Sequence, residues 1–200
     1  FIKLEIPITS STGFHATSYY NHNTKEVVIA YTGTNGISDV NDDGKLALRL
    51  STEQTPEAIK FLETTNTEIK NTYGLELKNT NVTITGHSLG GYLAQKVIQD
   101  VLSKGTINKD DLAAVIFNSP GTGEKVEYSK NIVSISDNND SINAVGGSKI
   151  TDNIMEVNSG TNDFYVSHKM DTMIKYLEEH PSIGLFTVKY LNELTDNEKQ

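Results

Sequence analysis

The feature that most constrains this chain is a glycine-flanked serine that lies between a short β-branched segment and an amphipathic segment. The sequence Gly86-His-Ser-Leu-Gly-Gly91 follows Val82-Thr-Ile-Thr85, and apolar residues at helical spacing then continue to Gly105. This order predicts a strand, a tight turn and a helix. Glycines on both sides relieve the crowding of such a turn, which leaves the Ser88 hydroxyl exposed above the sheet. The alternative is a glycine-rich turn with only a structural role.

The rest of the chain alternates between strand-like and helix-like patterns. An antiparallel hairpin is predicted from His15 to Thr32 and a helix from Thr55 to Tyr73, with a long connection over 33–51 that has no clear period. Further strands are predicted at 113–118, 131–136 and 154–157, and a helix at 168–179. The pattern predicts an α/β fold with a mostly parallel central sheet, helices on both faces and an N-terminal antiparallel hairpin. Sites in such sheets form at the carboxyl ends of the strands.

Composition excludes several classes of function. The chain has 200 residues, no cysteine and a formal net charge of −9. Thiolate metal sites and cysteine nucleophiles are therefore excluded, and the negative charge disfavours nucleic acids and anionic membrane surfaces as partners. No apolar run is long enough to predict a transmembrane segment. The length predicts one domain over 1–200, in which 181–200 has no assignable pattern.

The start of the chain and its lack of cysteine bear on where the protein works. The chain begins with Phe1 rather than Met, so we expect a processed chain or a domain of a longer protein. A protein without cysteine fits the cytosol and the extracellular space alike. We favour a secreted protein or a bacterial effector domain over a cytoplasmic one, and the sequence predicts no oligomeric state.

Two segments together resemble a known family. The elbow at 86–91 and the upstream Val27-Val-Ile-Ala-Tyr-Thr-Gly-Thr34 are similar to the corresponding segments of the class 3 (fungal-type) lipases, and Thr34 precedes Ser88 by 54 residues. The resemblance spans about Phe14 to Leu177 and implies an α/β-hydrolase fold. It also implies an oxyanion hole formed by Thr34 and by the backbone N–H of Leu89. Thr32 stands where the family has an arginine.

A serine nucleophile needs a base and an acid that orients the base. In α/β-hydrolases the chain order is Ser, acid, His, which leaves His168 and His180 as candidate bases. We predict His168, because it follows a strand and loop, whereas a histidine at the end of a helix such as His180 more often caps carbonyls. For the acid, the resemblance favours Asp140, because the family's Asp is followed two residues later by an aliphatic residue, here Ile142. Asp137 is the alternative, and it could equally cap the turn.

Three other features have a structural interpretation as well as a functional one. The His87 side chain is expected to point away from Ser88 and to serve packing or contact with the substrate. The run Asp39-Val-Asn-Asp-Asp-Gly44 matches half of an EF-hand loop, but position twelve is Leu50, so we expect a solvated acidic loop and no bound metal. Leu46, Leu48 and Leu50 would form either an apolar flap over the site or core contacts.

These observations predict a serine carboxylic-ester hydrolase, lipase-like, that acts through an acyl-enzyme on lipid or other small ester substrates. Ser88, Asp140 and His168 would do the chemistry, and no cofactor is expected. A phospholipase or acyltransferase effector domain is the closest alternative. A hydrolase-fold binding module without activity is the other. Because no basic patch is evident, any transient contact with a lipid interface would use apolar surface around Leu46–Leu50 or bridging cations.

Overall fold

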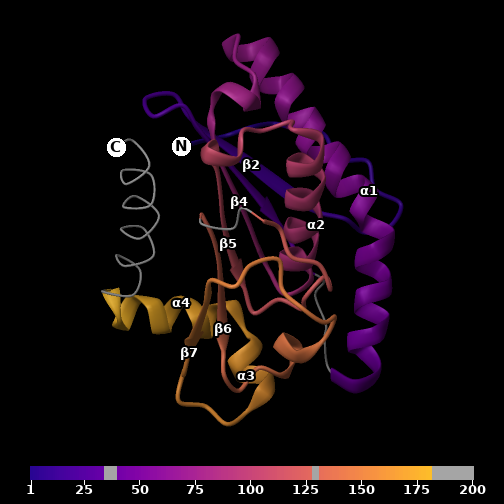
Figure 1. The fold of residues 1–200 in the computed structure, drawn as a ribbon, viewed down its shortest axis with the longest axis vertical. Helices are drawn as coiled ribbons and strands as arrows, with labels where there is room; N and C mark the ends of the chain where they lie inside the picture. Colours follow the sequence, from indigo (N-terminus) through magenta and orange to yellow (C-terminus); the bar gives the residue numbers. More distant parts are fainter. Residues whose placement is uncertain (34–39, 128–130, 182–200) are drawn as a thin grey trace.

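The described part of the chain forms a seven-stranded sheet in which the strands follow one another in sequence order (Figure 1). The computed structural model describes residues 1–33, 40–127 and 131–181. The strands β1 to β3 are antiparallel and β3 to β7 are parallel. The strands are β1 (Ile2–Lys3), β2 (Ala16–Asn21), β3 (Glu26–Tyr31), β4 (Asn81–His87), β5 (Leu112–Phe117), β6 (Ile132–Asp137) and β7 (Ile154–Val157).

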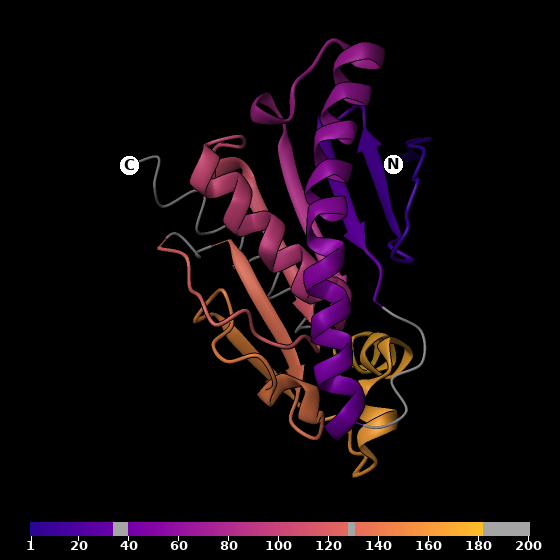
Figure 2. The same ribbon diagram turned by 90° about the vertical axis from the view of Figure 1, so that its right-hand side faces the viewer.

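Helices cover both faces of this sheet, as Figures 1 and 2 show. The helices α1 (Val40–Tyr73) and α2 (Leu89–Lys104) lie on one face, and α3 (Phe164–His168) and α4 (Met170–Glu179) belong to the other side. Short helical turns η1 (Leu77–Asn79), η2 (Lys109–Asp111) and η3 (Ser141–Ala144) lie in the connections. The predicted fold class is therefore confirmed.

Side-chain alternation along the strands explains the two layers. In β5, Ala114 and Ile116 are fully buried in the main core with α1 and α2, while Val115 and Phe117 pack in a second cluster with Met173 of α4. All six residues of β6 are buried, which fits a strand covered on both faces. The two helical layers thus stabilise the carboxyl end of the sheet from both sides.

The first helix is longer than the sequence predicted. The expected helix begins at Thr55 with Pro56 in the first turn, but α1 begins at Val40 and contains Pro56 in its interior. Proline inside a helix removes one backbone hydrogen bond and destabilises it by about 3 kcal/mol. The buried face of α1, which includes Phe61, Leu62 and Ile69, offsets that loss. The prediction of a structureless connection up to residue 51 was therefore wrong from residue 40 onwards.

The C-terminal helical region also differs from the prediction. His168 does not begin a helix but ends the short helix α3, and Lys169 in an extended conformation separates it from α4. Asp163 caps α3 by accepting hydrogen bonds from the backbone N–H groups of Tyr165 and Val166. Within the described ranges, no helix is both long and apolar enough to cross a membrane.

Candidate active site

Ser88 occupies a strained turn between β4 and α2. Its φ of 57° and ψ of −125° lie in a region that residues with a side chain rarely adopt. The neighbouring glycines are required by space: a Cβ on Gly86 would lie 2.3 Å from the Gly90 oxygen, and one on Gly90 would lie 2.2 Å from the Tyr31 oxygen. The elbow predicted from the sequence is therefore present, and it is packed against the end of β3.

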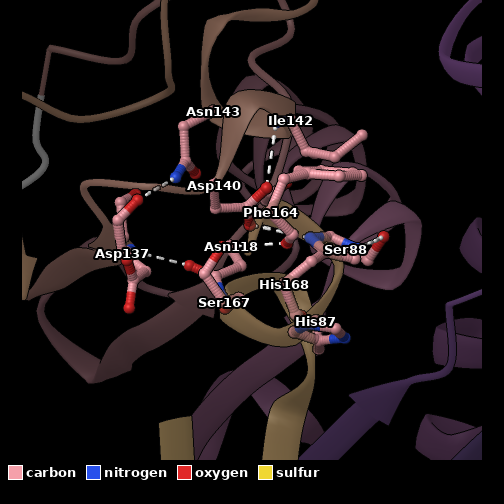
Figure 3. Close-up of polar contacts among 12 residues, drawn as sticks. His87, Ser88, Asn118, Asp137, Asp140, Ile142, Asn143, Phe164, Ser167 and His168 are labelled. Carbon is pink, nitrogen blue, oxygen red and sulfur yellow. Dashed lines mark hydrogen bonds and ion pairs between the residues drawn. The ribbon is translucent and has the colours of Figure 1, made fainter. Parts of the chain in front are cut away.

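The structure brings Ser88, His168 and Asp140 together in one hydrogen-bonded series (Figure 3). The Ser88 Oγ lies 2.8 Å from the His168 Nε2, and the His168 Nδ1 lies 2.7 Å from the Asp140 Oδ2. Ser88 is 3% exposed, Asp140 3% and His168 9%. A carboxylate can only accept here, so the Nδ1 carries the proton and the Nε2 is free to accept one from the serine.

The two candidate acids have different surroundings. Asp140 accepts the Ile142 N–H at 3.0 Å through the oxygen that does not face His168, which caps η3. Both carboxylate oxygens of Asp137 accept backbone N–H groups, from Asn139 at 2.9 Å and from Ser159 at 3.1 Å. Asp140 is therefore the carboxylate that contacts His168, whereas Asp137 is hydrogen-bonded to backbone N–H groups, one of them in the turn that precedes Asp140.

The backbone around His168 is contacted by side chains from two strand ends. The His87 Nε2 lies 2.6 Å from the His168 carbonyl oxygen, and the Asn118 Nδ2 donates to the Ser167 carbonyl oxygen at 3.0 Å. The His87 side chain thus points away from the Ser88 hydroxyl (Figure 3), as the sequence predicted. Burial, and then the charge of His168, lower the pKa of His87 from 6.5 to about 4.

Asn118 and Lys149 are two buried polar residues near this site that the sequence analysis did not predict. Asn118 directly follows β5, is fully buried and has a φ of 41°. Lys149 donates to the Ser119 carbonyl oxygen at 3.0 Å, the Ser136 hydroxyl at 2.8 Å and the Asn143 amide oxygen at 3.0 Å. Burial lowers the pKa of Lys149 to about 8. Asn118 could have been predicted as a site residue, because it is polar and directly follows a buried strand. The residues around Lys149 in the sequence give no indication that its side chain is buried.

A small apolar cluster adjoins the polar series. Leu89 and Ile142 are both 2% exposed and pack with half-buried Phe164, apart from the main core. The Phe164 ring stacks on the His168 ring with 6.2 Å between centroids. These side chains come from α2, η3 and α3, so an apolar cluster packs the three elements together beside the site.

The predicted oxyanion contacts are only in part within the described residues. Thr34 lies outside them, but Gly33 is described: a Cβ placed on it would lie 3.4 Å from the Ser88 Cβ. Leu89 is the first residue of α2, where backbone N–H groups have no acceptor inside the helix. Gly33, which follows β3, and the first residue of α2 therefore both lie beside Ser88.

The remaining sequence expectations concern His180, calcium and the leucine flap. The exposed His180 donates from Nδ1 to the Tyr176 carbonyl oxygen at 2.9 Å, so it caps a helix end as expected. Asp39 lies outside the described residues, and the backbone that follows it is helical from Val40, which is not the geometry of an EF-hand loop. In the described ranges no group of three or more His, Asp or Glu could hold a metal. The side chains of Leu46, Leu48 and Leu50 also fall outside the description.

Comparison of the sequence with family models gives one match. The model of a phospholipase-like family, described as the Tle-like phospholipase domain, matches residues 3–159. This range contains Ser88 and Asp140 and ends before His168. No curated protein matches the sequence.

Comparison of the structure with solved structures gives fungal lipases. A fungal lipase–inhibitor complex matches with a TM-score of 0.54 and 16% identity over 71% of this chain and 59% of the other. Rhizomucor miehei lipase, as a propeptide complex of a deletion mutant, matches with a TM-score of 0.51 and 17% identity over 70% and 48%. A triacylglycerol lipase whose catalytic centre is described as a serine protease triad matches with a TM-score of 0.53 and 17% identity over 71% and 59%.

These matches confirm a lipase-like α/β-hydrolase fold, since identities in this range bear on the fold alone. The chain spans between 48% and 59% of the length of these lipases.

Proposed function

Because this chain belongs to the family of Tle-like phospholipase domains, we propose that it is a serine ester hydrolase that cleaves acyl esters of lipids through an acyl-enzyme. The observation that carries the proposal is the hydrogen-bonded series from Ser88 through His168 to Asp140, which begins in a strained elbow. A serine, a histidine and a carboxylate in this order form the arrangement that activates a hydroxyl for acyl transfer.

The first half-reaction forms one bond and breaks another. The Ser88 Oγ attacks the ester carbonyl carbon while the His168 Nε2 takes the hydroxyl proton. The tetrahedral intermediate then collapses, the bond from the carbonyl carbon to the alcohol oxygen breaks, and His168 gives its proton to the departing alcohol. Asp140 holds the Nδ1 proton and stabilises the imidazolium without taking that proton.

The second half-reaction repeats the chemistry with water. His168 takes a proton from a water molecule that attacks the acyl carbon, and the proton returns to Ser88 as the carboxylic acid leaves. We propose that the N–H groups of Thr34 and Leu89 stabilise the negative oxygen in both halves. The position of Leu89 at the start of α2 supports this, because the unpaired N–H groups and the dipole of a helix N-terminus favour negative charge.

The proposed substrate class is phospholipid. One finding supports it: the matching family model is described as a phospholipase domain. A triacylglycerol lipase with the same fold has a catalytic centre described as a serine protease triad, which supports the assignment of the three residues. The chemistry requires no cofactor.

Active-site labelling with a fluorophosphonate is the direct test, because the probe reacts only with an activated serine. We expect the wild-type chain to be labelled and to release fatty acid from phosphatidylcholine vesicles. Ser88→Ala should abolish labelling, and His168→Ala should lower kcat/KM by at least about 1,000-fold.

The matched control for Ser88 is Ser18→Ala. Ser18 is also fully buried, but its hydroxyl pairs with Thr65 at 2.8 Å, between β2 and α1. Ser18→Ala should keep its labelling. Labelling that survives in Ser88→Ala would contradict the proposal, and hydrolysis of triglyceride but not phospholipid would contradict the substrate class.

A further inference from the structure

The carbonyl groups at the C-terminal end of α3 accept hydrogen bonds from side chains outside the helix. Ser167 and His168 are the last two residues of this short helix, where carbonyl groups lack donors inside the helix. Lys169, with φ −66° and ψ 137°, is extended, so the helix does not continue through it into α4. The carbonyl groups of Ser167 and His168 are satisfied instead by side chains from the sheet.

The two donors come from neighbouring strand ends. His87 ends β4 and is the register partner of Phe117, and Asn118 directly follows Phe117. A carbonyl oxygen only accepts, so the His87 Nε2 carries the proton in its 2.6 Å contact with the His168 oxygen. The Asn118 amide is oriented because its Oδ1 accepts the Asp137 N–H at 2.8 Å, which leaves its Nδ2 to donate to Ser167.

His87 connects the serine and the histidine of the site, because it is the neighbour of Ser88 in the chain and contacts His168. His87 is covalently joined to Ser88, and it holds the backbone of the residue that hydrogen-bonds to Ser88. The His87 ring also lies 4.9 Å from the His168 ring, between centroids. His87, Ser88 and His168 are therefore linked in a ring of one peptide bond and two hydrogen bonds, which limits the distance between the Ser88 Oγ and the His168 Nε2.

We propose that His87 and Asn118 are positioning residues that together clamp the backbone of His168, so that its Nε2 stays within hydrogen-bonding distance of Ser88. The proposal rests on the proposed function, in which His168 is the base. Neither side chain takes part in proton transfer. Their effect is geometric, and misplacing a reacting group by about 1 Å lowers a rate about 100-fold.

His87 suits this role because its Nε2 can donate without placing a positive charge beside His168. Its low pKa, about 4, leaves a single Nε2–H donor at neutral pH. Among the described residues, the charged or titratable groups that act on its pKa are His168 of α3 and Asp140, which precedes η3. The His87 imidazole is therefore neutral at pH 7, and its contact with the His168 carbonyl oxygen keeps its proton on Nε2.

The test uses paired substitutions at His87. His87→Phe keeps an aromatic ring and loses the donor, whereas a glutamine amide nitrogen reaches about as far as the Nε2 and restores it. We expect His87→Phe to lower kcat for ester hydrolysis by about 10- to 100-fold with KM changed less than about twofold. His87→Gln should recover to within about threefold of wild type, because the donor returns.

Asn118→Asp tests the second contact separately, and it serves if His87→Phe does not fold. It keeps the acceptor for the Asp137 N–H and removes the donor to Ser167, so kcat should fall by about tenfold. Thr85→Val is the matched control, because Thr85 also donates from β4 to a backbone carbonyl, that of Val115 at 2.7 Å. It should leave kcat unchanged.

A spectroscopic measurement separates this proposal from the proposed function. The proton that His168 Nδ1 shares with Asp140 should give a far-downfield NMR resonance, whether or not an ester is turned over. That resonance should broaden or shift in His87→Phe and remain in His87→Gln and Thr85→Val.

If the wild type neither hydrolyses esters nor reacts with a fluorophosphonate, the proposed function fails while the resonance still tests the clamp. An unchanged resonance and kcat in His87→Phe, or equal losses in His87→Phe and His87→Gln, would overturn the clamp.

Discussion

The two halves of the candidate site are built in different ways. The elbow with Ser88 depends on close backbone contacts within 86–91 and with the end of β3, where glycines are the only residues that fit. The segment that carries His168 instead depends on side chains that are distant in the sequence. His87 and His168 are 81 residues apart, and Asn118 and Ser167 are 49 apart.

The two halves therefore depend on different kinds of sequence information. A strained turn is specified by a few adjacent residues, so its sequence pattern is recognisable without a fold. A loop held by hydrogen bonds from distant strands has no comparable pattern, because any polar residue at the strand end can serve. Substitutions should therefore disrupt the two halves in distinguishable ways.

The largest effect is expected in the half that carries the acid. Asp140→Asn should lower kcat/KM by about 10,000-fold, equivalent to about 5.5 kcal/mol of transition-state stabilisation, because the amide no longer holds the required tautomer of His168. Asp137→Asn should lower it less than about tenfold. The same change should reduce the free energy of unfolding by about 1–3 kcal/mol, because Asp137 accepts two backbone N–H groups.

Steady-state kinetics and urea denaturation of both variants would check these values. Equal losses of activity in the two variants would show that the acid cannot be assigned to Asp140 from its contact with His168.

The next effect tests the elbow. A Cβ on Gly90 would lie 2.2 Å from the Tyr31 oxygen, so Gly90→Ala should force the end of β3 and the start of α2 apart. We expect the free energy of unfolding to fall by about 3 kcal/mol and the rate of ester hydrolysis to fall by about 100-fold. Gly74→Ala is the control, because a Cβ added to Gly74 meets no atom within 4 Å, so that only its positive φ of 68° opposes the substitution.

Gly74→Ala should cost about 1 kcal/mol and leave the activity unchanged. Thermal denaturation and initial rates of both variants decide the matter. The steric account of the elbow fails if Gly90→Ala is no less stable than Gly74→Ala.

The smallest effect concerns pH and the link between the two halves. The pKa of His87 is about 4 in the folded protein and near 6.5 when the chain unfolds, so the unfolded state binds more protons between these values. The free energy of unfolding should therefore be fully maintained above pH 6.5 and fall as the pH drops towards 4. Between pH 7 and 4.5 the loss from His87 is about 2 kcal/mol.

His87→Gln removes this titration, so its stability should fall less than that of the wild type over the same range. Urea denaturation at the two pH values measures the difference between the chains. A difference near zero would mean that His87 is solvated enough to take up a proton in the folded protein.

Most of the sheet could be predicted from the sequence because its strands have short-range signatures. The hairpin of β2 and β3, the strands β4 to β7 and the end of α2 at Gly105 all follow from β-branched runs and turn residues. The start of α1 could not be predicted, because Pro56 is a good signal for a first turn and only tertiary packing keeps it inside the helix.

The candidate site divides in the same way. Ser88 follows from the elbow pattern, and His168 and Asp140 follow from chain order together with the resemblance to lipases. The structure places these three within hydrogen-bonding distance, so the residues chosen from the sequence meet in space. Asn118 and Lys149 were not found, because their roles depend on which carbonyl groups the fold brings to them.

Local sequence is enough to predict the strand, the elbow and the helix that carries Ser88, since the glycine spacing leaves few other conformations. The sequence left Asp137 open as an alternative to Asp140, and it did not indicate that His87 and Asn118 donate to the backbone at Ser167 and His168. The physical reason is the range of the interactions. Steric exclusion between adjacent residues is encoded locally, whereas a hydrogen bond between residues 81 apart exists only after the sheet has brought its strand ends to one edge.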